Sequence, residues 1–181
     1  MSESILLEYQ KTIPKSLRII TNISHTSFFK ELEKLSDDKI SNFFHENLLR
    51  FPIPNVFFKY TKYGIVIRNH TASDKYSMNW HYDNKQLIKH KISDLQKIHS
   101  LQIVSMDEKY IYGLYCINPI QSTIIIYFDT YNIDFEGGEF HFHDQTIYPQ
   151  RGMLLFFHVD NLHKVTPLTG GKRRAIVVKI F

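Results

Sequence analysis

Residues 153–181 read MLLFFHVDNLHKVTPLTGGKRRAIVVKIF, and this stretch indicates the fold. Two runs within it, MLLFFH (153–158) and RRAIVVKIF (173–181), are short and rich in β-branched or aromatic residues, which is typical of β-strands. A proline and two glycines lie between the runs, as expected where the chain turns. The same texture recurs from residue 55 onward, so the sequence predicts a protein built mainly from strands.

Further segments extend this pattern and add helices. Seven more strand-like runs are VFFKY (56–60), YGIVIRN (63–69), YSMNWHYD (76–83), LQIVSM (101–106), YIYGLYCI (110–117), STIIIYFD (122–129) and GEFHFHD (138–144). Ahead of them, SFFKELEKL (27–35) and DDKISNFFHENLL (37–49) carry apolar stripes at helical spacing, and Ser24 or Thr26 is a suitable N-cap for the first. Short strands behind two helices indicate a mainly β fold with N-terminal helices, a double-stranded β-helix or jelly-roll barrel.

We expect a single domain over residues 1–181, with helical support at about 24–50 and the barrel at about 55–181. No repeat, low-complexity tract or linker-like segment divides the chain. The stretch 84–121 is less regular, and we interpret it as an elaboration of the same domain near the mouth of the site.

Composition and charge are those of an ordinary globular protein, with 43% hydrophobic and 22% charged residues. A net charge of +4 permits an acidic partner but does not require one. The single cysteine, Cys116, excludes an internal disulfide and a cysteine-based zinc finger. The N-terminus lacks a signal-peptide pattern and no apolar run is long enough for a membrane span, so we expect a soluble, cytoplasmic protein without a membrane partner.

The triplet HYD at residues 81–83 places a histidine and a carboxylate two positions apart. On an extended strand His81 and Asp83 point to the same face, because side chains alternate with a period of two. His163 follows much later, in the loop-like segment DNLHKV. Two histidines and one carboxylate are the ligands of the facial triad that holds non-haem Fe(II) and leaves positions open for oxygen chemistry. These three residues are therefore the candidate catalytic and metal-binding residues.

Two further histidine patterns compete with this triad. His158 and Asp160 form a second H-x-D triplet, but no histidine follows His163 to complete it at a wide spacing, so we expect a structural role for both. His141 and His143 form the H-x-H pair that a cupin, another jelly roll, uses to bind metal. That pattern needs a glutamate shortly downstream, and none follows within reach. A cupin-type metal protein nevertheless stays open as an alternative.

Three segments resemble the prolyl- and lysyl-hydroxylase-like branch of the Fe(II)/2-oxoglutarate-dependent dioxygenase superfamily. HKVTPLTGGKRR (163–174) is similar to the closing segment of that group, where the distal histidine precedes a V-x-P stretch, a glycine and a basic residue. TIIIYFDTYNIDFEGGEFHF (123–142) resembles its strand and D-[YF]-E-G-G turn, and YPQRGMLLFFH (148–158) its P-x-x-G strand. The resemblance covers about residues 76–181, apart from the irregular stretch.

The resemblance implies roles for particular residues. His81, Asp83 and His163 correspond to the iron ligands. Arg173 corresponds to the residue that pairs with the distal carboxylate of 2-oxoglutarate, and Arg174 is the alternative if the strand register differs by one.

Two aromatic residues also correspond to positions near the co-substrate. Tyr127 occupies the place of a tyrosine that hydrogen-bonds to 2-oxoglutarate, with a core aromatic as the alternative role. Phe140 would line the pocket as an apolar wall. If Phe140 and Phe142 face inward, alternation turns His141 and His143 outward, which is a physical argument against the cupin alternative.

The implied activity is hydroxylation with Fe(II), 2-oxoglutarate and O2, with ascorbate as a further cofactor and release of succinate and CO2. A prolyl or lysyl side chain of a protein or peptide is the leading substrate. A nucleic-acid demethylase or hydroxylase is an alternative, since a basic stretch made by Lys85, Lys89, His90, Lys91 and Lys97 lies near the predicted site. We also keep two further hypotheses, a small-molecule hydroxylase and an inactive barrel that serves as a binding module.

Overall fold

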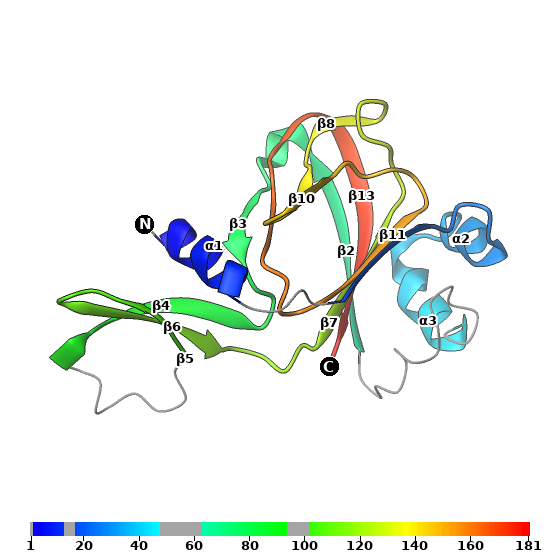
Figure 1. Cartoon of the computed structure of the whole chain (residues 1–181). Coiled ribbons are helices and arrows are strands. Elements are labelled where there is room, and N and C mark those ends of the chain that lie inside the picture. The colour runs from blue at the N-terminus through cyan, green and yellow to red at the C-terminus, as the bar shows by residue number, and fades with distance from the viewer. Residues whose placement is uncertain (1, 13–16, 48–62, 94–101) are drawn as a thin grey trace.

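The structure, a computed structural model, describes residues 2–12, 17–47, 63–93 and 102–181 (Figure 1). The strand predicted at 56–60 lies outside the described residues. The N-terminal elements are α1 (Ser2–Thr12), β1 (Arg18–Asn22), α2 (Ser27–Leu32) and α3 (Asp37–Asn47). The following strands, interrupted by one 3-10 turn at Ala72–Asp74, are β2 (Tyr63–Thr71), β3 (Met78–His81), β4 (Lys85–Lys91), β5 (Gln102–Met106), β6 (Tyr110–Cys116), β7 (Ser122–Tyr127), β8 (Phe135–Gly137), β9 (Phe140–Phe142), β10 (Gln145–Ile147), β11 (Met153–His158), β12 (His163–Val165) and β13 (Leu168–Ile180).

Two antiparallel sheets form the barrel, a double-stranded β-helix as predicted. The larger sheet has the order β1-β11-β7-β13-β2, with β8 paired to β13. The smaller sheet has the order β10-β9-β12-β3. In Figure 1 the two sheets curl around a common interior, and the long strand β13 of the larger sheet lies between β7 and β2.

The alternation of side chains along β7 and β13 divides the core into two layers. Ile125 and Tyr127 of β7 pack between the sheets, against residues of β9, β11 and β12. Ile124 and Ile126 face the opposite way and pack against α2 and α3. Every residue of β7 is buried, so its sequence (STIIIY) shows no alternation of apolar and charged residues.

The helices α2 and α3 cover the outer face of the larger sheet, as predicted (Figure 1). Thr26 caps α2, because its side chain accepts a hydrogen bond from the Phe29 backbone. Phe28 and Phe29 are buried within this layer together with Ile40 of α3. Burial of each such side chain contributes about 1.5–3 kcal/mol to stability.

The stretch that looked irregular in the sequence forms a third sheet of order β4-β6-β5. Helix α1, which periodicity did not predict, contacts β3 and β5, and Leu6 packs in one cluster with Leu114 and Tyr82. In Figure 1 this sheet and α1 extend from the end of the barrel where β3 leads into β4. Within the described ranges, no helix has the length and apolarity needed to cross a membrane.

Candidate active site

The pairing of β12 with β3 brings the two candidate histidine ligands together. His163 is the direct cross-strand partner of His81, and their ring centroids are 4.2 Å apart. The prediction that His163 lies in a loop was wrong, because it begins the strand β12, which is inserted between β9 and β3. A three-residue strand is too short to show a period of two in the sequence.

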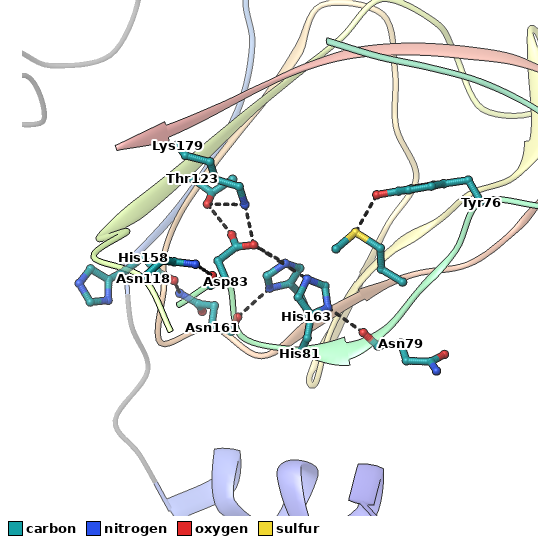
Figure 2. A network of polar contacts seen from close by, with 11 residues as sticks. Tyr76, Asn79, His81, Asp83, Asn118, Thr123, His158, Asn161, His163 and Lys179 are labelled. Carbon is teal, nitrogen blue, oxygen red and sulfur yellow. Dashed lines mark hydrogen bonds and ion pairs between the residues drawn. The ribbon is translucent and has the colours of Figure 1, made fainter. Parts of the chain in front are cut away.

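Asp83 joins the histidines from a bend rather than from a strand. We predicted that His81 and Asp83 share one extended strand, but β3 ends at His81 and the chain bends before β4 begins at Lys85. The carboxylate still reaches the histidines: its Oδ1 lies 3.8 Å from His163 Nε2 and 3.9 Å from His81 Nε2. One potential ligand atom from each residue lies within 4.8 Å of the other two (Figure 2).

Hydrogen bonds orient both imidazole rings for metal binding. His81 Nδ1 lies 2.7 Å from the carbonyl oxygen of Asn79, and His163 Nδ1 lies 2.9 Å from that of Asn161. Because a carbonyl only accepts, each Nδ1 carries the proton and each Nε2 presents a lone pair toward Asp83. His81 Nε2 is buried and has no hydrogen-bond partner among the described residues. This donor set, with the tautomers of its histidines fixed by backbone carbonyls, fits a divalent metal ion.

The electrostatics keep Asp83 and His163 in their metal-binding protonation states. Burial lowers the pKa of His163 to about 3 despite the opposing effect of Asp83, so the imidazole is neutral near pH 7. Burial raises the pKa of Asp83, but His163, Lys179 and a hydrogen bond from Thr123 outweigh it and lower the pKa to about 2. The carboxylate is therefore ionised. A neutral imidazole and an ionised carboxylate are the forms that bind metal.

The sequence did not lead us to predict two polar residues that lie beside Asp83. Lys179 Nζ lies 2.5 Å from Asp83 Oδ1, and Thr123 Oγ1 donates to Asp83 Oδ2 at 2.5 Å (Figure 2). The signal was available in β13, because residues 173, 175, 177 and 179 lie on one face of a strand. On that face Lys179 follows the apolar residues Ala175 and Val177, so a charged side chain is expected to point into the barrel.

A cavity inside the barrel is lined by Asp83 and His163 of the triad and by Arg173. It is lined by residues from both sheets: Arg68, Tyr76, Met78, Asp83, Thr123, Ile125, Tyr127, Phe140, Phe157, His163, Val165, Arg173, Ala175, Val177 and Lys179. Arg173 is only 6% exposed and donates from Nη1 to the Gly138 carbonyl at 2.7 Å. Its Nε is buried and has no hydrogen-bond partner in the described part of the chain. A buried guanidinium with an unused donor suits a carboxylate ligand.

The neighbouring arginine has a different environment. Arg174 donates from Nη2 to Asp37 Oδ1 at 2.8 Å and to the Leu35 carbonyl at 3.0 Å, which ties β13 to the start of α3. Alternation along the strand accounts for the difference, since consecutive side chains point to opposite faces. The structure therefore places Arg173, not Arg174, in the cavity.

The two aromatic candidates also line this cavity. Burial raises the pKa of Tyr127 to about 12, with Arg173 opposing the rise, so its hydroxyl stays protonated near neutral pH. Phe140 stacks on the His163 ring with centroids 5.2 Å apart and planes 12° apart. Phe157 contacts the same imidazole edge-on at 4.8 Å. His163 is thus held by two aromatic rings as well as by its hydrogen bond.

The competing histidines lie away from the candidate metal position. Phe140 and Phe142 are buried in β9, whereas His141 lies on the other face with Nδ1 2.9 Å from Thr146 Oγ1. His158 Nδ1 pairs with Asp160 Oδ2 at 3.1 Å, outside the cavity lining. Among the described residues, the group formed by His81, Asp83 and His163 is the one whose ligand atoms converge on a possible metal position.

An open groove of about 580 Å³, lined by His81 and Asp83 of the triad, meets the cavity at Asp83. It is lined by α1, by the β3–β4 segment and by the third sheet, through Leu6, Arg68, Met78, Trp80, His81, Tyr82, Asp83, Lys85, Gln86, Leu87, Leu114, Ile117, Asn118, Ile120 and Lys179. Asp83 and Lys179 border both spaces. The predicted placement of the 84–121 stretch near the mouth of the site agrees with this lining.

Comparison with solved structures identifies similar folds at low sequence identity. A Pseudomonas putida prolyl-4-hydroxylase matches with 10% identity and a TM-score of 0.53, over 97% of this chain and 93% of that one. HygX from Streptomyces hygroscopicus with iron bound matches with 14% identity and a TM-score of 0.51, over 98% of this chain and 84% of that one. HygX with nickel and 2-oxoglutarate bound matches with a TM-score of 0.50. The comparison with curated protein sequences finds no match.

The family profile of the 2OG-Fe(II) oxygenase superfamily matches residues 67–181, well over half of the chain. The matched region contains the converging His-Asp-His group, the cavity arginine and most strands of the barrel. The chain therefore belongs to the 2OG-Fe(II) oxygenase superfamily and is a 2-oxoglutarate-dependent dioxygenase that requires Fe(II).

Proposed function

We propose that His81, Asp83 and His163 bind the Fe(II) of this dioxygenase, and that Arg173 pairs with the distal carboxylate of 2-oxoglutarate. The observation that carries the proposal is that Asp83, His163 and Arg173 line one cavity and that His81, the cross-strand partner of His163, converges with them from the adjoining groove. His81 Nε2 and Arg173 Nε are both buried and have no partner in the described ranges. A metal ion would bind His81 Nε2, and a carboxylate would accept a hydrogen bond from Arg173 Nε. Tyr127 and Phe140 complete the co-substrate site as hydroxyl donor and apolar wall.

Each residue has a separate task in this arrangement. When bound, the iron couples the oxidative loss of CO2 from 2-oxoglutarate to hydroxylation of a C–H bond, which leaves succinate. Asn79 and Asn161 fix the tautomers of the two histidines through their carbonyls. Phe140 and Phe157 hold the His163 ring and exclude water from that side of the site. Arg173 orients the co-substrate along the cavity axis.

We propose a prolyl or lysyl side chain of a peptide as the substrate. The groove supports this choice, because its open trough borders the triad and offers apolar wall from Trp80, Leu87 and Ile117 alongside polar groups. An extended peptide can lie in such a trough while one side chain reaches the metal. Prolyl peptides are the first to test, since the similar Pseudomonas putida protein is a prolyl-4-hydroxylase.

The test is incubation of the iron-loaded enzyme with 2-oxoglutarate and a library of proline- and lysine-containing peptides, read by mass spectrometry for the gain of one oxygen atom. Ile117→Glu provides a matched variant, because the Ile117 side chain is 55% exposed in the groove and is not one of the proposed metal ligands. It should reduce peptide hydroxylation and leave 2-oxoglutarate binding unchanged. Absence of any hydroxylated peptide, together with hydroxylation of another substrate class, would exclude the peptide proposal.

A nucleic acid is the second candidate substrate, and one contact favours it. Lys89 Nζ lies 3.7 Å from the ring centroid of Tyr110 and 5.5 Å from that of Tyr112, on the sheet that borders the groove. The sequence showed the basic stretch but not these rings, which come from the neighbouring strand β6. Tyr112 is buried, so the feature that suits single-stranded nucleic acid is Lys89 beside the partly exposed ring of Tyr110. Salt-sensitive binding of an oligonucleotide that Lys89→Glu abolishes would support this candidate.

A further inference from the structure

We propose that Lys179 is an internal counter-cation of the iron site: in the metal-free protein its ammonium group binds the oxygen of Asp83 that faces the histidines, and a metal ion must displace it. The inference rests on the proposed ligand set of His81, Asp83 and His163. It concerns a residue that neither the sequence resemblance nor the triad requires.

The carboxylate of Asp83 has two oxygens with different partners. Oδ2 accepts a hydrogen bond from Thr123 Oγ1 at 2.5 Å. Oδ1 is 2.5 Å from Lys179 Nζ, and the same Oδ1 lies 3.8 Å and 3.9 Å from the Nε2 atoms of the two histidines. Oδ1 is therefore the oxygen positioned for the metal, and the ammonium group already occupies it. Figure 2 shows Lys179 and the histidines on either side of this carboxylate.

The strand register places Lys179 beside Asp83. Lys179 is the cross-strand partner of Thr123 in the β13–β7 pair, and its Nζ donates to Thr123 Oγ1 at 3.2 Å. The Lys179 side chain is 22% exposed and the Asp83 side chain 6%. A lysine this enclosed is unfavourable unless it is paired, and the intervening residues on this face of β13 between Arg173 and Lys179 are Ala175 and Val177. The ion pair explains why a lysine is stable at this position.

A metal ion and this ammonium group cannot both keep close contact with Oδ1 without strong repulsion. Metal–oxygen bonds to a carboxylate are about 2 Å long and Nζ lies 2.5 Å from Oδ1, so a divalent ion on Oδ1 would lie within about 4.5 Å of Nζ at its present position. In a site with little water, repulsion between a divalent ion and an ammonium at that separation is large. The ammonium must move toward the groove, which Lys179 also lines, when metal binds.

A role for Lys179 in positioning Asp83, rather than in competing with the metal, predicts the opposite change in metal affinity. If Lys179 merely positions Asp83 for the metal, its removal loosens a ligand and weakens metal binding. If Lys179 competes with the metal, its removal tightens metal binding. The sign of the change therefore separates the two roles without any measurement of turnover.

The experiment measures the dissociation constant of Co(II), as a probe for Fe(II), by competition with a fluorescent chelator. Wild type is compared with Lys179→Met, which removes the charge but retains length, and with Lys179→Arg, which retains the charge. Lys85→Met is the matched control, because Lys85 also lines the groove and is 22% exposed but pairs with Asp160 instead. We expect Lys179→Met to bind Co(II) about tenfold more tightly or better, and the Lys179→Arg and Lys85→Met variants to resemble wild type.

Thermal melting provides a second readout. Without metal, Lys179→Met should melt at a lower temperature than wild type, because Asp83 loses its counter-charge. With saturating Co(II) the gap should narrow, since metal then neutralises Asp83. Should Lys179→Met not fold, Lys179→Gln replaces it in both measurements. Equal or weaker Co(II) binding by a folded charge-free variant would overturn the inference. Retention of Co(II) affinity by His81→Ala would instead overturn the ligand assignment itself.

Discussion

Gly138 accepts a hydrogen bond from Arg173 at 2.7 Å, and a Cβ atom added to Gly138 would lie 2.8 Å from the same Nη1. Gly138 also has φ = +70°, a conformation that favours glycine. The glycine turn between β8 and β9 thus admits the guanidinium and fixes it at the end of the cavity. The position of the candidate co-substrate residue depends on a residue with no side chain.

Gly138→Ala should weaken 2-oxoglutarate binding by about tenfold or more and lower the melting temperature, because the added methyl displaces Arg173 and the left-handed backbone costs about 1–2 kcal/mol. Titration calorimetry with 2-oxoglutarate on metal-loaded protein checks the first effect. Gly170→Ala is the control, since its nearest neighbour atom would be 3.5 Å away. Equal losses in both variants would show that Arg173 is not the cause.

Arg173→Met should weaken 2-oxoglutarate binding by about 2 kcal/mol, or roughly thirtyfold, because a buried charge-assisted pair loses one partner. Arg174→Met should leave binding unchanged and only lower the melting temperature, since Arg174 contacts Asp37 and Leu35. Titration calorimetry with 2-oxoglutarate on both variants checks this difference. The reverse result would show that the register of β13 is displaced by one residue.

The metal-free protein should lose stability as the pH falls below about 6.5. The pKa of His163 is lowered to about 3, so the unfolded chain binds a proton between the two values that the folded protein does not bind. At pH 4.5 this amounts to about 2–3 kcal/mol. Asp83, with its pKa lowered to about 2, adds a loss below about pH 4 in the same direction. Urea unfolding at pH 7 and 4.5 tests this, and His163→Gln should show a smaller loss than wild type.

His141→Ala and His143→Ala together should leave metal content unchanged, because His141 lies on the face of β9 opposite the cavity and neither residue converges with the triad. His81→Ala and Asp83→Ala should each remove most of the bound metal. The Co(II) content of each purified variant, measured by inductively coupled plasma mass spectrometry after loading with Co(II), checks both expectations. Loss of metal in the double variant at His141 and His143, with retention in the two single variants, would restore the cupin-type alternative.

Much of the fold could be predicted because the pattern is local and strong. The cap at Thr26, the apolar stripes of α2 and α3, and the alternation in β9 all follow from residues a few positions apart. The inward position of Phe140 and the outward position of His141 required only the period of two. Helix α1 was not predicted from the sequence. Its apolar residues pack against the third sheet (β4-β6-β5), which begins only at Lys85, far along the chain from the helix.

The site could be predicted as a set of residues but not as a geometry. The spacing of His81 and Asp83 suggested a shared strand face, whereas a bend after His81 actually presents the carboxylate. The contact between His81 and His163 depends on the pairing of a three-residue strand, which no local pattern encodes. Lys179 and Thr123 meet Asp83 only through the register of β13 on β7. Counting in steps of two from Arg173 would have indicated Lys179, but not its partner.

The most direct test of the proposed iron centre is succinate formation from 2-oxoglutarate by anaerobically Fe(II)-loaded protein after admission of O2, without added substrate. Wild type is compared with Asp83→Ala and with Asp160→Ala, which alters the second H-x-D triplet and lies outside the cavity. We predict that wild type and Asp160→Ala form succinate at similar rates and that Asp83→Ala forms none. Succinate formation by folded Asp83→Ala at the wild-type rate would contradict the assignment of Asp83 as an iron ligand.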